Sequence, residues 1–244
     1  AFPKMRGYAQ PPRTGQVRRR PIQPLRPTSA AEPFSIQVFA AELQEYLLIQ
    51  QIKHASVFGY SMGGYVALYL AKQQPQLFSE IVTLATKFEW NEAIAAKETA
   101  MLNTERILEK VPAFAEQVKQ RHAPNDWKLV LDKTKIMLLQ MGKENPLLLS
   151  DYATINQPVL LLLGDDDKMV TREETEAVQN ALPNSRFQLL EQTGHPIEKV
   201  NIILNLLSIS RSQSDFLYYT SSRPGNPLYE KPIADIGNGM FQVF

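Results

Sequence analysis

The sequence predicts an α/β fold in which helices flank a parallel sheet, and two observations support this prediction. Short apolar stretches of strand length alternate with segments whose apolar residues recur at helical spacing. One of these stretches, residues 159–163, contains aliphatic side chains only, which is typical of a parallel strand that is buried on both faces. Because strands that alternate with helices form βαβ units, the pattern favours the α/β class.

The predicted elements begin where apolar residues first recur at helical spacing. Ser35 is the expected N-cap of a helix that should end near residue 52. Further along, Thr171 and Glu174 form a capping box, which predicts a helix that continues to about residue 182. The other expected elements are strands at 55–59, 81–85, 159–163 and 187–190, and helices at 63–72 and 197–208.

The region between the second and third expected strands has a helical pattern throughout. Residues 91–142 predict two or three helices, and Ile107, Val111, Phe114 and Val118 mark one apolar face. This region is therefore a helical insertion between two strands of the sheet.

The two ends of the chain differ in composition from the middle. Residues 1–31 contain seven basic residues and no acidic one, and seven of the 17 prolines fall in residues 1–33. Such a segment cannot build a core, so we expect residues 1–34 to form a disordered basic arm. Residues 35–210 form the predicted core, and residues 211–244 form a tail with candidate strands at 216–220 and 240–244.

Composition excludes several classes of protein. The chain has 244 residues and no cysteine, which excludes a disulfide scaffold and any thiolate metal site. No apolar stretch approaches the length of a membrane span, and no leader pattern opens the sequence, so we expect a cytoplasmic protein. The basic arm lacks the interleaved aromatic residues of many nucleic-acid binders, so we expect no nucleic-acid partner. The oligomeric state is not readable from the sequence.

The strongest chemical signal is the G-x-S-x-G motif of residues 59–63. An apolar strand precedes it and an apolar helix follows it, which is the setting of a nucleophilic serine on a tight strand-to-helix turn. Ser61 is then the nucleophile, and the backbone N–H of Met62 points toward the developing oxyanion. The alternative, a phosphate-binding turn, calls for a lysine near the helix start, whereas the first lysine after this turn is Lys72.

A nucleophilic serine needs a general base, and the chain contains three histidines. His54 lies at the start of the strand that leads to Ser61, and His122 lies in the helical insertion. His195 follows the strand at 187–190 and so lies at the same sheet edge as Ser61. The acid that orients the histidine is expected directly after the strand at 159–163, where we favour Asp167 over Asp166.

Residues 35–208 resemble α/β-hydrolase-fold serine hydrolases of the esterase and lipase-like type. The segments that carry the resemblance are 58–68, 158–167 and 194–195. The resemblance implies that Ser61, Asp167 and His195 form a catalytic triad and that residues 88–150 are a cap inserted after the strand at 81–85. It implies neither a cofactor nor a metal. Residues expected to contact substrate are Tyr60, Trp90 and Met169, and the cap residues Met101, Phe114 and Met137 either line an acyl pocket or belong to the core of the cap.

The sequence departs from this family ahead of Ser61. The family has several strands before the nucleophile, and a His-Gly loop there supplies a second oxyanion N–H. No His-Gly pair precedes Ser61 here, so the sequence predicts an N-terminally incomplete hydrolase. The Ser61 strand would then be an exposed sheet edge unless one of the two candidate tail strands covers it.

We therefore expect a serine hydrolase that acts on small carboxylic esters or related acyl substrates. One alternative uses the same triad for hydrolysis of a C–C bond or for an elimination. An alternative of another class is an inactive truncated remnant or an interaction module.

Overall fold

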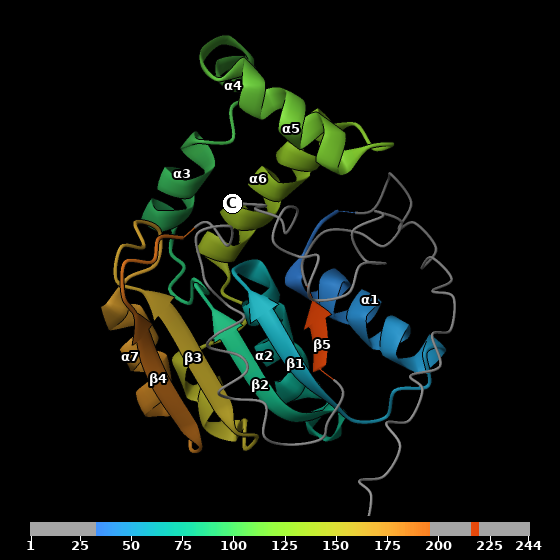
Figure 1. Ribbon diagram of the computed structural model, residues 1–244, viewed down its shortest axis with the longest axis vertical. Coiled ribbons are helices and arrows are strands. Elements are labelled where there is room, and N and C mark those ends of the chain that lie inside the picture. The colour runs from blue at the N-terminus through green and yellow to red at the C-terminus, as the bar shows by residue number, and fades with distance from the viewer. Residues whose placement is uncertain (1–32, 196–215, 220–244) are drawn as a thin grey trace, which may run out of the picture.

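The computed structural model describes residues 33–195 and 216–219, and these residues form a parallel sheet flanked by helices (Figure 1). The described strands have the order β4-β3-β2-β1-β5, and each neighbouring pair is parallel. The α/β fold with a parallel sheet is thereby confirmed. The strands are β1 (Ala55–Tyr60), β2 (Phe78–Leu84), β3 (Val159–Gly164), β4 (Ser185–Leu190) and β5 (Phe216–Tyr219). Residues 1–32 of the predicted arm, the helix at 197–208 and the strand at 240–244 lie outside the described residues. Phe34, which we also assigned to the arm, packs against the hydrophobic core.

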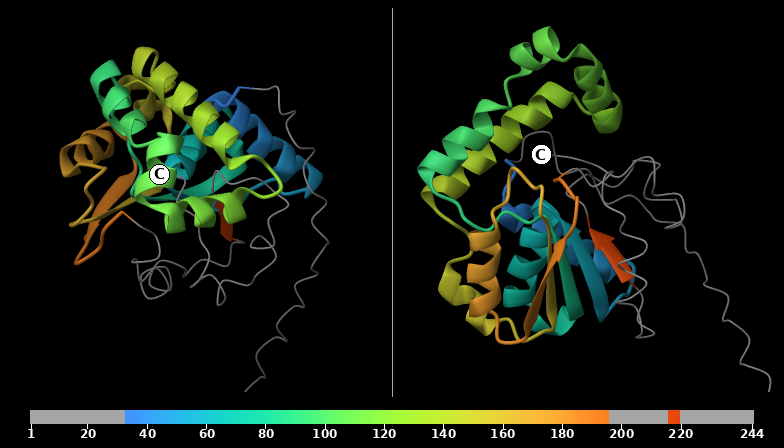
Figure 2. Two further views of the ribbon diagram at one scale, coloured as in Figure 1. Left: turned by 90° about the horizontal axis from the view of Figure 1, so that it is seen from above. Right: turned by 60° about the vertical axis from the view of Figure 1, so that its left-hand side comes forward.

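Three helices pack on one face of the sheet. Helix α2 (Met62–Gln73) packs on β1 and β2, α7 (Arg172–Ala181) packs on β3 and β4, and α1 (Ile36–Ile49) packs on α2 (Figure 2). The Ser35 hydroxyl accepts a hydrogen bond from the N–H of Val38, so the predicted N-cap of α1 is confirmed. Helix α1 ends three residues before the expected position. Gln51, just beyond it, has a φ of 58°, and a right-handed α-helix cannot continue through a residue with a positive φ.

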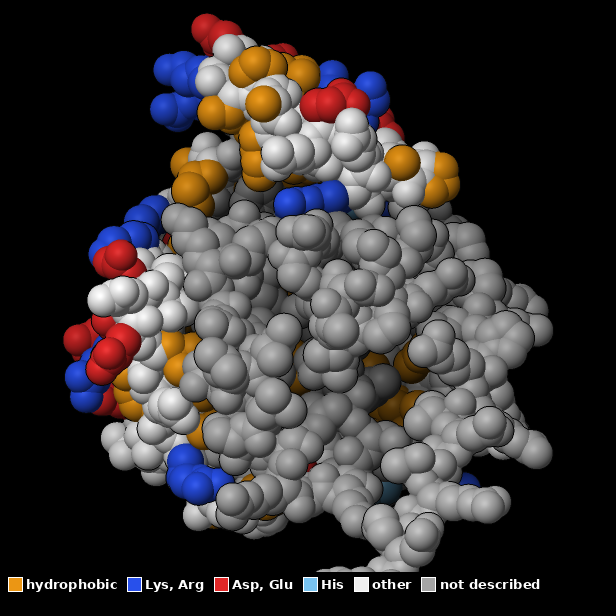
Figure 3. All heavy atoms as spheres, in the orientation of Figure 1, with side chains coloured by type: hydrophobic (Ala, Val, Ile, Leu, Met, Phe, Trp, Pro, Cys, Tyr) orange, Lys and Arg blue, Asp and Glu red, His pale blue; other side chains and the backbone are white. Residues whose placement is uncertain are grey.

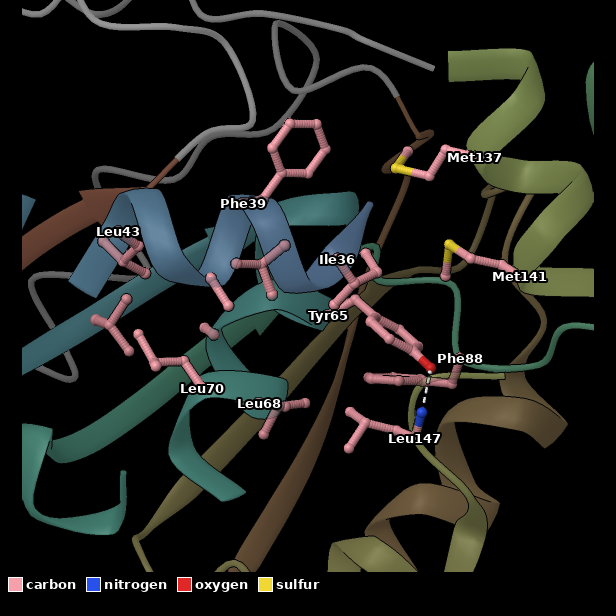
Figure 4. Close-up of a cluster of buried hydrophobic side chains, with 14 of the residues drawn as sticks. Ile36, Phe39, Leu43, Tyr65, Leu68, Leu70, Phe88, Met137, Met141 and Leu147 are labelled. Carbon is pink, nitrogen blue, oxygen red and sulfur yellow. Dashed lines mark hydrogen bonds between the residues drawn. The ribbon is translucent and has the colours of Figure 1, made fainter. Parts of the chain in front are cut away.

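The main hydrophobic core lies between the sheet and these helices. Apolar side chains of α1 and α2 meet there, as Ile36 and Tyr65 show in Figure 4. The Tyr65 hydroxyl donates to Asn145 Oδ1 and accepts a hydrogen bond of 2.9 Å from the N–H of Leu147. Burial raises the pKa of Tyr65 well above its ordinary value, so this hydroxyl stays neutral and serves both bonds. The bonds join α2 to the chain where it leaves the cap.

The cap contains four helices in the described structure, rather than the two or three that the sequence predicts. The expected apolar face through residues 107–118 is interrupted, because α4 ends at Lys110 and α5 begins at Pro112. Proline disfavours the helical conformation of the residue before it and suits the first position of a new helix. Val111 is accordingly 48% exposed. The cap helices are α3 (Glu92–Ala100), α4 (Thr104–Lys110), α5 (Pro112–His122) and α6 (Trp127–Lys143).

The cap stands over the ends of the strands toward which their arrows point (Figures 1 and 2). On the face seen in Figure 3, its surface mixes basic, acidic and hydrophobic side chains. Two short 3₁₀ helices complete the described elements, one between α2 and β2 (Pro75–Leu77) and one between the cap and β3 (Leu149–Thr154). The carboxyl ends of the strands and the cap therefore enclose the space in which Ser61 lies.

Strand β1, which leads to Ser61, is paired on both sides. It pairs with β2 along its length and with β5 from Ser56–Phe216 to Gly59–Tyr219. Of the two outcomes that the sequence left open for β1, an exposed edge or an edge covered by a tail strand, the structure shows the second, with the strand expected at 216–220 in that place. The pairing satisfies backbone N–H and C=O groups that an edge strand leaves open.

Two glycines bring β1 and α2 together at the turn that carries Ser61. A Cβ atom on Gly59 would lie 2.5 Å from the backbone N and Cα of Gly64. The close approach is therefore between Gly59 and Gly64, the residue that follows the G-x-S-x-G motif. Because backbone atoms cannot rotate away, we expect Gly59→Ala to destabilise the fold by about 1–3 kcal/mol, measured by urea unfolding.

A matched substitution at Gly64 separates a clash with backbone atoms from a clash with a side chain. A Cβ atom there would lie 2.0 Å from Thr86 Oγ1, a side-chain atom, and 3.1 Å from the Gly59 carbonyl oxygen. Thr86→Ala should therefore recover part of the stability lost in Gly64→Ala and none of that lost in Gly59→Ala. Equal recovery in both backgrounds would contradict the backbone contact as the cause.

Candidate active site

Ser61 occupies the turn between β1 and α2 in a strained backbone conformation. Its φ is 50° and its ψ is −120°, a region that residues with a side chain rarely adopt. The Ser61 N–H donates to the carbonyl oxygen of Leu84 at the end of β2, which fixes the turn against the neighbouring strand. Such strain persists only where the surroundings enforce it, and it is concentrated at functional sites. Met62 is the first residue of α2, so its N–H has no acceptor within the helix.

His195 lies between Ser61 and Asp167. Its Nε2 atom is 3.4 Å from Ser61 Oγ, and its Nδ1 atom is 2.8 Å from Asp167 Oδ2. The side chains of His195 and Asp167 are 6% and 0% exposed. The three residues follow the carboxyl ends of β1, β3 and β4, so the parallel topology itself places them at one edge. The structure thus brings the three expected triad residues together in one hydrogen-bonded line.

The three consecutive aspartates that follow β3 have different partners. Asp167 faces His195, whereas Asp166 forms an exposed ion pair with Lys168. Asp165 Oδ1 accepts the N–H of Thr193, which joins the loop after β3 to the loop that carries His195. The acid position beside the histidine is therefore occupied by Asp167 and not by Asp166.

The pKa of Asp167 reflects two opposed effects. Burial opposes ionisation, but the hydrogen bond and charge of His195 and the N–H groups of Val170 and Met169 favour it. The second group prevails, so the pKa of Asp167 lies below its ordinary value of 3.8. The Asp167 carboxylate is then ionised at neutral pH, which is the state that stabilises an imidazolium.

Tyr60 was expected to contact substrate, and the structure places it elsewhere. Its side chain is buried, and its hydroxyl donates a hydrogen bond of 2.8 Å to the backbone carbonyl of His195. The two rings lie 5.6 Å apart between centroids. Tyr60 thus contacts the histidine loop and is not among the residues that line the cavity.

A cavity lies between Ser61 and the cap. It encloses about 520 Å³, counting the space at its mouth. Trp90 and Met169 line it, as expected, whereas Met101, Phe114 and Met137 do not. Met137 and Phe114 pack in the core of the cap, and Met101 is exposed. The lining residues are Ser61, Met62, Tyr65, Lys87, Trp90, Glu98, Thr134, Leu138, Met169, Val170 and His195.

Comparison with known proteins gives the family of this chain. The profile of the serine aminopeptidase S33 family matches residues 38–199, which include Ser61, Asp167 and His195. The chain belongs to this family. It is therefore a hydrolase of the α/β fold.

Relatives of this S33-family chain are also hydrolases by name. The hydrolase YugF of Bacillus subtilis (strain 168) is 27% identical over 176 residues, and the match covers 63% of each chain. RutD of Pseudomonas savastanoi pv. phaseolicola, named provisionally as a carbamate hydrolase, is 26% identical over 211 residues, or 78% of each chain.

Solved structures share the fold. An α/β hydrolase from a Medee basin deep-sea metagenome library, MGS-M2, has a TM-score of 0.57 at 17% identity over 76% of this chain and 75% of the other. An α/β-hydrolase-fold protein from Chitinophaga pinensis has a TM-score of 0.53 at 18% identity over 72% and 71% of the two chains.

Sequence reasoning missed a second function of Glu174 in this S33-family chain. Its carboxylate closes the predicted capping box with the N–H of Thr171 and also accepts the N–H groups of residues 88 and 89, where the chain enters the cap. Lys87 Nζ lies 3.4 Å from this carboxylate and donates to the carbonyl oxygen of Met169 at 2.9 Å. The cap entrance is thereby bonded to the loop of Asp167, a contact that no local pattern encodes.

In the part of the chain that the structure describes, no group of three or more His, Asp or Glu side chains is placed to hold a metal ion. Among the described helices, none combines the length and the apolar character that a bilayer span requires. His54, one of the two histidines set aside above, bonds Gln76 on the surface, and His122 ends α5.

Proposed function

We propose that the protein hydrolyses small carboxylic esters or related acyl compounds, with Ser61 as nucleophile, His195 as general base and Asp167 as the orienting acid. The observation that carries the proposal is the line from Ser61 Oγ through His195 to Asp167 Oδ2 at the wall of a cavity. A serine and a histidine in this relation, with a carboxylate behind the histidine, are the elements of acyl transfer through a covalent intermediate.

The hydrogen bonds suggest how protons move in the reaction. With Nδ1–H donating to Asp167, the Nε2 atom of His195 carries the lone pair that takes the Ser61 proton. The Ser61–His195 separation of 3.4 Å is long for a hydrogen bond, as is common before substrate binds. The proton then passes from His195 to the leaving group, and a water activated by the same nitrogen releases the acyl group from Ser61.

We assign stabilisation of the tetrahedral oxyanion to the N–H of Met62, which has no acceptor within α2. The N-terminal end of α2 adds a favourable field there. The substrate class rests on the cavity, whose walls are largely apolar and close to Ser61. The name of RutD extends the candidate acyl substrates to carbamates, whose cleavage uses the same steps.

Covalent labelling with a fluorophosphonate tests the proposal. We expect one equivalent of probe to attach to Ser61, because the serine must be activated by His195 to attack phosphorus. Tandem mass spectrometry of the labelled protein identifies the modified residue. Ser185→Ala, a matched loss of a serine away from the cavity, should label fully, and prior incubation with a p-nitrophenyl ester should slow labelling.

Two outcomes of the labelling experiment would contradict the proposal. A folded protein that takes up no probe, or that takes it up at a residue other than Ser61, contradicts the serine hydrolase mechanism.

A further inference from the structure

A buried carboxylate in the cap shares the cavity with Ser61. Glu98 of α3 is only 5% exposed and lines the cavity, and its Oε2 atom is buried without a hydrogen-bond partner. Leaving such a group unsatisfied is costly, and each one in a folded protein calls for an explanation. A ligand in the cavity that donates a hydrogen bond to Oε2 supplies the explanation.

A second unsatisfied group lines the same cavity. The Nε1 atom of Trp90 is buried and also has no hydrogen-bond partner. An indole N–H donates only, and a carboxylate oxygen accepts only. Among the described cap residues that line the cavity, Glu98 thus carries an unpartnered acceptor and Trp90 an unpartnered donor. The other described cap residues on its wall are Leu138 and Thr134, and the Thr134 hydroxyl donates to the carbonyl of Val130 at 2.8 Å.

Lys87, the one lysine or arginine among the described residues that line the cavity, has other partners. Lys87 Nζ lies 2.9 Å from the Met169 carbonyl oxygen and 3.4 Å from Glu174 Oε1. The Lys87 ammonium therefore pairs with Glu174 of α7, and among the described residues it is not a partner of Glu98 in α3. The acceptor on Glu98 is left for a ligand.

We propose that Glu98 and Trp90 form a polar subsite that binds a neutral amide or hydroxyl group in the acyl part of the substrate. The N–H or O–H of this group donates to Glu98 Oε2, and its oxygen accepts from Trp90 Nε1. An amide or a hydroxyl satisfies both atoms, whereas a plain alkyl chain satisfies neither and an ammonium satisfies only the carboxylate. This inference rests on the proposed function, because it assumes that Ser61 attacks a carbonyl in this cavity.

Three p-nitrophenyl esters of equal chain length test the subsite. Their acyl chains end in a methyl group, a primary amide or an ammonium. We expect kcat/KM to be highest for the amide, and the ratio of amide to methyl substrate to fall about tenfold or more in Glu98→Leu, because the hydrogen bond is lost and the unsatisfied acceptor no longer opposes an alkyl chain. The decisive measurement is this ratio, which a general loss of activity does not change.

Further variants separate the contributions of charge and hydrogen bonding. Glu98→Gln keeps an acceptor oxygen and should retain most of the amide preference. Trp90→Phe keeps an aromatic ring without the N–H and should reduce the preference even if Glu98→Leu does not fold. Glu92→Leu, a substitution of an exposed glutamate on the same helix, is the control and should leave the ratio unchanged.

Two results would overturn the inference. An unchanged ratio in folded Glu98→Leu and Trp90→Phe excludes the subsite. If the protein prefers the ammonium ester and loses that preference in Glu98→Gln, the group that the subsite binds is a cation and not a neutral amide or hydroxyl. Fluorophosphonate labelling of each variant distinguishes failure of the subsite from failure of the proposed function. If only the subsite is wrong, Ser61 stays reactive, whereas if the proposed function is wrong, even the unaltered protein takes up no label.

Discussion

Replacing Ser61 with alanine is expected to lower kcat by about 10⁶-fold, the scale seen when the nucleophile of a serine protease triad is removed. The Ser61 hydroxyl is the atom that His195 Nε2 faces, and no other described hydroxyl is hydrogen-bonded to that nitrogen. The rest of the cavity wall is unchanged by the substitution, so KM should move little. Steady-state hydrolysis of a p-nitrophenyl ester measures the loss. Active-site titration gives the concentration of active enzyme in the unaltered protein.

Folding of the variant is a built-in control. Alanine keeps the Cβ atom and therefore the strain that belongs to a φ of 50°. We expect the free energy of unfolding of Ser61→Ala to stay within about 0.5 kcal/mol of the unaltered protein. A folded variant that retains a hundredth or more of the activity would assign the chemistry to another residue.

Asp167→Asn is expected to lower kcat by about 10⁴-fold, as found when the triad aspartate of a serine protease becomes an amide. The amide loses the negative charge that stabilises the imidazolium, and its NH₂ group favours the tautomer of His195 that leaves no lone pair for Ser61. Asparagine still offers an oxygen to the N–H groups of Met169 and Val170, so the turn should persist.

Asp166→Asn is the matched control for this substitution. Asp166 lies next in sequence and forms an exposed ion pair with Lys168, an interaction that contributes little in water. We expect kcat to change less than about twofold, since such surface pairs are worth under about 1 kcal/mol even for stability. A larger effect at Asp166 than at Asp167 would reverse the assignment of the acid.

The effect of Asp167→Asn on stability should depend on pH. The pKa of Asp167 is lower in the folded protein than its ordinary value of 3.8, so ionisation of Asp167 favours folding at any pH above that value. This contribution is lost as the pH falls through the lowered pKa. Urea unfolding should therefore show a stability difference between Asp167→Asn and the unaltered protein that is constant near neutrality and shrinks below about pH 4.

Local patterns predicted most elements, because the information for them lies in neighbouring residues. The N-cap at Ser35 and the capping box of Thr171 and Glu174 were readable from sequence and are present in the structure. The helix boundary at Val111 was missed although Pro112 signals it, because the apolar spacing on both sides was read as one face. Glu98 also had a local signal, since it lies on the buried side of α3 with Ala95 and Thr99.

By itself, the sequence determined the α/β class, the turn that carries Ser61 and the three residues that follow strands at one sheet edge. These follow from periodicity, turn chemistry and the rule that parallel strands end together. Only the tertiary structure decided that Asp167 rather than Asp166 faces His195, that β5 covers β1, and that Glu98 shares a cavity with Ser61. Each of these joins residues distant in the chain or depends on where a side chain points, and so depends on packing that no local pattern contains.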